Sequence, residues 1–183
     1  MILRMDIQYK QNFYDKATVG LLAQLGNMGL ESQEYKNAKF YTERFRNAFQ
    51  DDKVKRYVFL ASNNNIWNFG YDSAGFCYAA SGVFSIMNGF RNWALMYIDE
   101  TNWRGGHPHY YLQHTKTGTF FDITYDQFAI DGITVPYDKG VKTAPALTPG
   151  DIPFKFAKIL NIDFIKALTN KRTQNYATAG TIR

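Results

Sequence analysis

Apolar residues recur at three- and four-residue steps between Glu34 and Phe49, in the segment EYKNAKFYTERFRNAF. This spacing places them on one side of an α-helix, and the positions concerned are Tyr35, Ala38, Tyr41, Phe45 and Phe49. We predict an amphipathic helix over Glu34–Phe49, ended by Asp51 and Asp52, and then a short strand over Tyr57–Ala61. The rest of residues 1–70 carries no recognisable motif, and we assign it to a helical N-terminal region.

A second helical pattern, built from smaller residues, covers Ala74–Asn88 (AGFCYAASGVFSIMN). It follows Asn63–Ser73, an Asn-rich segment that also contains Gly and Asp and is typical of a loop. We predict a buried helix with Asp72 or Ser73 as its N-cap and Gly89 at its end. The single cysteine of the chain, Cys77, falls in the first turn of this helix.

Short runs typical of β-strands follow Gly89. We predict strands over Ala94–Ile98, His109–Gln113 and Thr119–Thr124, the last two joined as a hairpin by a turn at Lys116–Gly118. The pattern then predicts a helical turn over Tyr125–Ala129, an irregular segment or short edge strand over Val135–Thr143, a linker over Pro145–Gly150, a helix over Asp151–Thr169 and a polar tail over 171–183. Helices followed by strands are typical of the α+β class, here with N-terminal helices packed on a small antiparallel sheet.

The composition is that of a single globular domain over residues 1–183, with 45% hydrophobic and 20% charged residues. The net charge of +5 is spread along the chain, and we find no nucleic-acid-binding signature or phosphate loop, so nucleic acid is not an expected partner. No apolar run approaches the roughly 20 residues of a membrane span, and the N-terminus lacks the features of a signal peptide. We therefore expect a cytoplasmic protein without membrane contact. The Asn-, Phe- and Tyr-rich composition also suits an AT-rich genome, and a viral source would place the protein in the host cytoplasm or the virion.

Three residues form a candidate catalytic constellation: Cys77 at a helix start, His109 at a strand start and Asp122 on the neighbouring strand. A helix N-terminus favours the thiolate form of a cysteine, and an adjacent imidazole favours it further and can protonate a leaving amine. A carboxylate on the other ring nitrogen fixes the tautomer. Adjacent antiparallel strands can bring His109 and Asp122 side by side on one face. We expect a helix packed on that same face to present Cys77 to them.

Each of these residues also has an ordinary structural explanation. A lone cysteine in an Ala-rich helix is more often a small core residue, and Asp122 by itself suits a turn cap. His107, His109, His114 and Asp122 contain the residue types of a zinc site, but Pro108 and the five-residue step to His114 argue against one. We expect no metal and no cofactor, His114 as an exposed strand residue, and Asp126 and Asp131 as solvated turn residues.

Three segments resemble the YunG-like family of papain-fold proteins: GFCYAASGVFSIMNGF, HYYLQH and TGTFFDITYDQF. The matching features are a G-x-C helix start, an H-Y-W-like strand, a D-x-T-x-x-Q-F element and a later P-Y pair. In this chain they correspond to Gly75 and Cys77, His109-Tyr110-Tyr111, Asp122 with Thr124, Gln127 and Phe128, and Pro136-Tyr137. The resemblance covers about Tyr71 to Gly140 and implies a papain-like core over about 71–140, between the helical N-terminal region over 1–70 and a C-terminal helix over 151–170. The same pattern is similar to the transglutaminase core, which has G-x-C-W, H-x-W and D-x-T segments.

The resemblance implies a Cys77–His109–Asp122 triad that forms a thioester on a peptide or protein amide, followed by hydrolysis or by transfer to an amine. Relatives often carry Gln before the cysteine, and here that position is Phe76. If the Gln side chain helps to form the oxyanion hole, this chain lacks that donor. Asn64, Asn65 or Asn68 of the preceding loop could substitute for it, alongside the backbone N–H of Cys77. Asn68, Phe76, Trp103 and Gln127 are our candidate oxyanion or substrate-binding residues. The second hypothesis is a catalytically inactive papain-fold module that binds a protein partner, alone or within a larger assembly.

Overall fold

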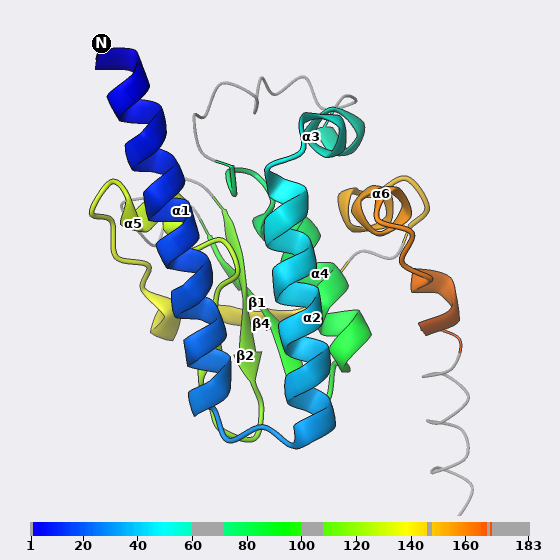
Figure 1. Ribbon diagram of the computed structural model, residues 1–183. Coiled ribbons are helices and arrows are strands. Elements are labelled where there is room, and N and C mark those ends of the chain that lie inside the picture. The colour runs from blue at the N-terminus through cyan, green and yellow to red at the C-terminus, as the bar shows by residue number, and fades with distance from the viewer. Residues whose placement is uncertain (1, 60–71, 100–107, 146–147, 168, 170–183) are drawn as a thin grey trace, which may run out of the picture.

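The computed structural model describes residues 2–59, 72–99, 108–145, 148–167 and 169, with the side chains of residues 2–7 left aside. Helices come first and strands follow, so the domain is α+β (Figure 1). The helices before the sheet are α1 (Ile2–Asn27), α2 (Ser32–Phe49), α3 (Asp52–Phe59) and α4 (Cys77–Asn88). The strands are β1 (Trp93–Ile98), β2 (His109–His114), β3 (Phe120–Phe121) and β4 (Val141–Thr143). The helical segments interleaved with and following the strands are α5 (Asp126–Ala129), the 3₁₀ turn η3 (Tyr137–Lys139) and α6 (Ile152–Ile159).

The strands form one antiparallel sheet in the order β3-β2-β1-β4. In its centre Leu95 of β1 lies opposite Leu112 of β2, and Met96 lies opposite Tyr111. Because side chains alternate along a strand, these two pairs belong to opposite faces of the sheet. Each face therefore has its own set of buried residues.

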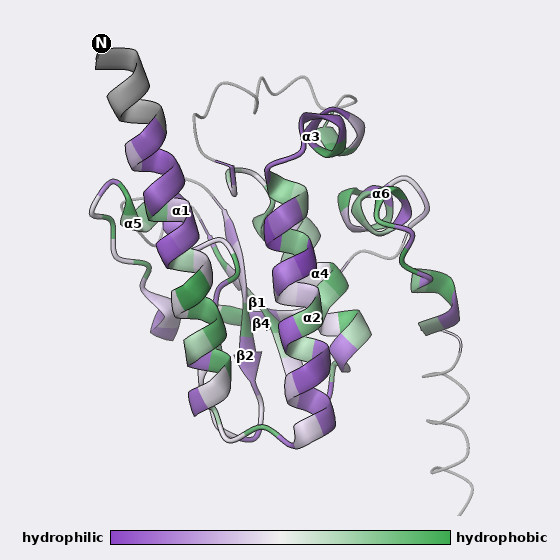
Figure 2. Cartoon of the chain, viewed as in Figure 1, coloured by the Kyte–Doolittle hydropathy of each residue, from purple (hydrophilic) through white to green (hydrophobic). Residues whose placement is uncertain are grey.

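Helix α4 covers one face of the sheet. Phe84 of α4 packs edge-on against Trp93 of β1, with ring centroids 5.1 Å apart, and it also contacts Phe121 of β3. Helices α2 and α6 pack on the outer side of α4. Figure 2 shows the consequence for the sequence: α4 is mostly hydrophobic because it is enclosed, whereas α2 also carries hydrophilic residues.

The opposite face holds a smaller apolar cluster that includes Met96, Ile98 and Tyr111, covered by Phe120, Phe128 and Tyr137. Helix α1 lies beside α2 and borders strand β3, where Gln24 Nε2 donates a hydrogen bond of 2.8 Å to the carbonyl oxygen of Phe120 (Figure 1). This contact satisfies a backbone acceptor of an edge strand. This bond links α1 to the β3 edge of the sheet.

Four predicted elements are confirmed, with their ends shifted by no more than two residues. They are the helix over Glu34–Phe49, the strands over Ala94–Ile98 and His109–Gln113, and the helical turn over Tyr125–Ala129. The predicted strand over Tyr57–Ala61 is wrong for Tyr57–Phe59, which belong to α3. There Val54 and Val58 are buried at a helical four-residue step. Residues 60 and 61 lie outside the described residues.

Three predicted boundaries also change. Helix α4 begins at Cys77 instead of Ala74, because Gly75 has a φ of 78° and Phe76 is the N-cap, not Asp72 or Ser73. Strand β3 is only two residues long, since the chain turns at Asp122. Helix α6 ends at Ile159, and Asn161 has a φ of 51°, so the single helix predicted over Asp151–Thr169 is broken. The tail over 171–183 lies outside the described residues.

In the portion of the chain that the structure describes, no helix is both long and apolar enough to cross a membrane.

Candidate functional site

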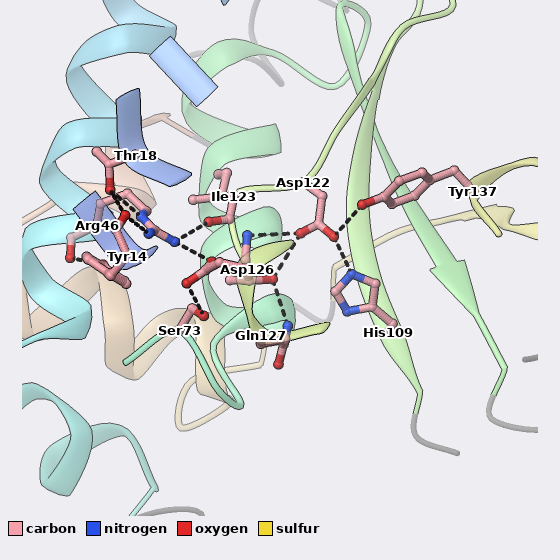
Figure 3. A network of polar contacts seen from close by, with 11 residues as sticks. Tyr14, Thr18, Arg46, Ser73, His109, Asp122, Ile123, Asp126, Gln127 and Tyr137 are labelled. Atoms are coloured by element: carbon pink, nitrogen blue, oxygen red, sulfur yellow. Dashed lines mark hydrogen bonds and ion pairs between the residues drawn. The ribbon is translucent and has the colours of Figure 1, made fainter. Parts of the chain in front are cut away.

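His109 and Asp122 form a buried hydrogen-bonded pair. His109 is the first residue of β2, and Asp122 directly follows the paired strand β3, so both side chains lie on the same face of the sheet. His109 Nε2 lies 2.7 Å from Asp122 Oδ2 (Figure 3). The two residues are 0% and 4% exposed. The structure therefore brings together two of the three residues of the predicted constellation in a site shielded from water.

Asp122 accepts several further hydrogen bonds. Tyr137 Oη donates to Oδ2 over 3.0 Å, and both the backbone N–H and the hydroxyl of Thr124 donate to Oδ1, over 2.9 and 3.0 Å. Gln127 Nε2 in turn donates to the Thr124 hydroxyl over 3.0 Å. A carboxylate with this many donors is held in one orientation, and its charged form is favoured.

The electrostatics of the pair favour an imidazolium beside a carboxylate. Burial lowers the pKa of His109, but the negative charge of Asp122, its hydrogen bond and the interaction with Cys77 outweigh this and raise the pKa to about 10. Burial raises the pKa of Asp122, yet His109 and Thr124 together hold it below its ordinary value. Burial and the Asp122 carboxylate raise the pKa of Tyr137, which keeps its hydroxyl a neutral donor.

Cys77 is the first residue of α4, and its side chain is partly buried. Its sulfur is close enough to His109 to be among the groups that raise the pKa of the imidazole. Our prediction that α4 would pack on the face of His109 and Asp122 is wrong: α4 packs on the other face, where Tyr78 contacts Tyr110, with ring centroids 4.5 Å apart. His109 is the first residue of β2, so the N-terminus of α4 approaches it at this edge of the sheet and not across the sheet face.

Phe76 has a core role. Its ring is fully buried, stacks on Phe49 with a centroid distance of 4.6 Å, and contacts Phe59 and Phe156. This side chain therefore has no surface for a substrate, contrary to its place among our candidate substrate-binding residues. Gln127 joins the site through its hydrogen bond to the Thr124 hydroxyl.

Asn68 and Trp103 lie outside the described residues, and so do Asn64, Asn65 and His107. Among the described side chains, no group of three or more His, Cys, Asp or Glu residues is arranged to hold a metal ion.

His114 lies at the other end of β2 and is buried, not exposed as predicted. Its Nε2 lies 3.3 Å from Glu34 Oε1, and its Nδ1 is 2.9 Å from the hydroxyl of Thr117. The Trp93 indole also donates to Glu34, over 3.0 Å. His114 therefore ties α2 to the sheet, far along the strand from Cys77.

A second ion pair near the site was not predicted. We interpreted Asp126 as a solvated turn residue, but it is 5% exposed and pairs with the guanidinium of Arg46, which is 1% exposed. A signal for Arg46 was present in the sequence: it lies between Phe45 and Phe49, on the apolar side of the predicted helix.

A cavity of about 310 Å³ borders Asp122 on the side of α1. Its lining residues are Gly20, Leu21, Gln24, Phe120, Asp122, Tyr125 and Tyr137. The N-terminal helix is thus among the immediate surroundings of the His109–Asp122 pair.

Comparisons with protein-family models, with curated proteins and with solved structures find no match to this chain.

Proposed function

We propose that this chain is a thiol-dependent amide hydrolase or acyl transferase, built on a papain-like domain, in which Cys77, His109 and Asp122 act as a catalytic triad. The observation that carries the proposal is the buried hydrogen bond of 2.7 Å between His109 and Asp122. The only cysteine of the chain, Cys77, is among the groups that raise the pKa of this histidine. Nucleophile, base and orienting carboxylate are the groups that this chemistry needs.

The reaction begins with attack of the Cys77 thiolate on the carbonyl carbon of a peptide or side-chain amide. The carbonyl oxygen takes up negative charge in the tetrahedral intermediate, and the backbone N–H of Cys77, at the N-terminus of α4, is one donor placed to bind it. The C–N bond then breaks, and the imidazolium of His109 gives its proton to the leaving amine. This leaves a thioester on Cys77 and a neutral His109.

The second half of the reaction regenerates the enzyme. His109 takes a proton from water, whose oxygen attacks the thioester carbonyl, and the C–S bond breaks to release a carboxylic acid and the thiolate. An amine in place of water gives a new amide, which is the transferase variant of the same chemistry. Because Nε2 of His109 is bonded to Asp122, Nδ1 is the nitrogen that exchanges these protons. No cofactor takes part.

A non-catalytic binding module is the second candidate, and the position of Phe76 favours it. A polar side chain directly before Cys77 would supply a second oxyanion donor, but Phe76 is enclosed by other aromatic rings of the core. Loss of one such donor lowers kcat by about 10²–10³. A chain of this kind would keep the fold and the His109–Asp122 pair and bind a protein partner.

Alkylation of Cys77 by iodoacetamide separates these two candidates. Because the chain has one cysteine, the modification rate reports on that thiol alone. We expect the folded chain at pH 6 to react at least about tenfold faster than the His109→Ala variant, since loss of the imidazolium removes the group that favours the thiolate. The matched control is His114→Ala, which removes a buried histidine from the same strand without touching Cys77.

Equal rates in the chain and in His109→Ala, or a thiol that reacts only in denaturant, would overturn the proposal and leave the binding module. A rate difference specific to His109 would justify a screen of fluorogenic peptide amides, in the presence and absence of a primary amine acceptor, with Cys77→Ser as the inactive control.

A further inference from the structure

Arg46 is a buried arginine whose side chain contacts four residues: Tyr14, Thr18, Ile123 and Asp126 (Figure 3). Its Nε donates to the Thr18 hydroxyl over 2.9 Å, and Nη2 donates to the carbonyl oxygen of Tyr14 over 2.9 Å; both partners belong to α1. The guanidinium also lies over the Tyr14 ring, 3.6 Å from its centroid. Nη1 donates to Asp126 Oδ1 and, over 3.2 Å, to the carbonyl oxygen of Ile123.

Two of these contacts connect Arg46 to the chain segments that carry the proposed catalytic residues. Ile123 is the neighbour of Asp122 in the chain, so its carbonyl fixes the backbone on which Asp122 is carried. The other carboxylate oxygen of Asp126 accepts a hydrogen bond of 3.0 Å from the Ser73 hydroxyl. Ser73 accepts at its own carbonyl from the N–H of Phe76 in the turn that leads into Cys77. The Arg46–Asp126 pair is thus bonded both to the Asp122 loop and to the turn before Cys77.

A gain in stability does not explain this pair. A buried ion pair loses the hydration of both charges, and an apolar pair of similar size is often as stable or more stable. Burial raises the pKa of Asp126, against the opposing effect of Arg46, which indicates the same unfavourable desolvation. What an apolar pair cannot provide is a set of directed hydrogen bonds to two separate segments of chain.

We propose that Arg46 and Asp126 are positioning residues, which align the turn before Cys77 with the Asp122 loop and so make the reactivity of Cys77 depend on helices α1 and α2. The inference rests on the proposed function, because it assigns a task to residues that touch neither substrate nor the reacting atoms. Under this proposal, helices α1 and α2 contribute to catalysis by fixing the geometry of the proposed triad.

Ser73→Ala tests this link most directly. It removes the hydrogen bond between Asp126 and the turn before Cys77 and leaves the Arg46–Asp126 ion pair in place. The matched control is Ser85→Ala, which removes a buried serine hydroxyl bonded to the Trp93 carbonyl oxygen near the far end of α4. The measurement is the rate of iodoacetamide alkylation of Cys77 as a function of pH in each full-length variant. Urea unfolding of the same variants checks that they have similar free energies of unfolding.

We expect Ser73→Ala to lower the alkylation rate at pH 6 by about tenfold, because the turn before Cys77 loses the bond that aligns it with the Asp122 loop. Ser85→Ala is expected to leave that rate within about twofold of the unmodified chain, since its lost bond is remote from Cys77. Equal profiles for the two variants would overturn the inference.

A second variant covers the case in which Ser73→Ala fails to fold. The double substitution Arg46→Met with Asp126→Leu removes both charges together, which avoids a lone buried charge. A folded double variant with an unchanged alkylation profile would also overturn the inference. The proposed function is judged separately by the comparison of the unmodified chain with His109→Ala, so the two failures are distinguishable.

Discussion

Near the candidate site, the described residues include two buried pairs of a carboxylate and a basic group, His109–Asp122 and Arg46–Asp126, and they differ in whether the basic group can release a proton. Asp122 pairs with His109, whose imidazolium can lose a proton, and Asp126 pairs with Arg46, whose guanidinium stays protonated. Both carboxylates are held by further hydrogen bonds. The first pair can therefore take part in proton transfer, whereas the second is suited only to holding chain segments in place.

The largest effect is expected at the Arg46–Asp126 pair. Arg46→Met leaves the Asp126 carboxylate buried without its counter-charge, and we expect the free energy of unfolding to fall by about 3–5 kcal/mol. Urea unfolding measures it. The double variant with Asp126→Leu should recover most of the loss, and a loss of less than about 1 kcal/mol in the single variant would contradict the role of this pair as a buried, mutually dependent unit.

The second prediction concerns how the stability contributed by the His109–Asp122 pair depends on pH. The pKa of His109 is raised, so its contribution to stability is complete below its ordinary value of 6.5 and is lost as the pH rises towards about 10. The pKa of Asp122 is lowered, so its contribution is complete above its ordinary value of 3.8 and is lost at more acidic pH. Between pH 3.8 and pH 6.5 the Asp122→Asn variant should therefore be less stable than the unmodified chain by about 1.5–3 kcal/mol.

Urea unfolding of both proteins from pH 3 to pH 10 measures that difference. It should shrink towards both ends of the range, and a difference that stays constant across it would show that the charges of His109 and Asp122 do not carry the effect.

Tyr137 should show a smaller effect of the same kind. Tyr137→Phe removes one donor from Asp122 and keeps the ring that packs on Tyr111 and Phe120, so we expect a loss of about 0.5–1.5 kcal/mol. The control is Tyr111→Phe, which also removes one hydroxyl but from a bond to the Tyr137 carbonyl oxygen. If Tyr137 acts through Asp122, only Tyr137→Phe should alter the alkylation rate of Cys77, and an equal effect of both variants would contradict this.

The smallest effect is expected at an exposed ion pair. Lys39 and Glu43 lie one turn apart on α2, 3.9 Å from each other, with about half of each side chain in water. Lys39→Ala should change the free energy of unfolding by no more than about 0.5 kcal/mol. A change as large as that of Arg46→Met, measured in the same urea experiment, would mean that burial is not what separates the internal pairs from surface ones.

Sequence patterns could predict much of this architecture, because strands β1 and β2 and helix α2 have regular apolar spacing that their final environment satisfies. They could also pair His109 with Asp122, since a short hairpin fixes which residues share a face. They placed α1 within a helical N-terminal region, which is confirmed, but could not give its bounds because its apolar spacing is only weakly regular. They did not predict the burial of Asp126. A charge in a turn is solvated unless a partner covers it, and here the partner is separated by 80 positions in the chain.

The same reasoning explains the error over α4. Its position in the chain predicted packing on the face of the sheet that carries His109. Which face a helix covers depends on the connection before it, and Gly75 redirects the chain with a left-handed backbone conformation just before the helix begins. Similarly, the apolar residues of Tyr57–Phe59 satisfied both a strand and a helix pattern, and packing of α3 against α2 and α6 decided between them.

The spacing of the two pairs along the chain has a consequence for synthesis on the ribosome. His109 and Asp122 are 13 positions apart and can meet as soon as one hairpin has emerged, whereas Arg46 must wait for Asp126, 80 positions later. Closing the longer loop costs about 1.6 kcal/mol more in chain entropy. Helix α2 is thus made early with a cation on its inner side, and that side becomes neutral only when α5 arrives, which makes the docking of the N-terminal helices a late event in folding.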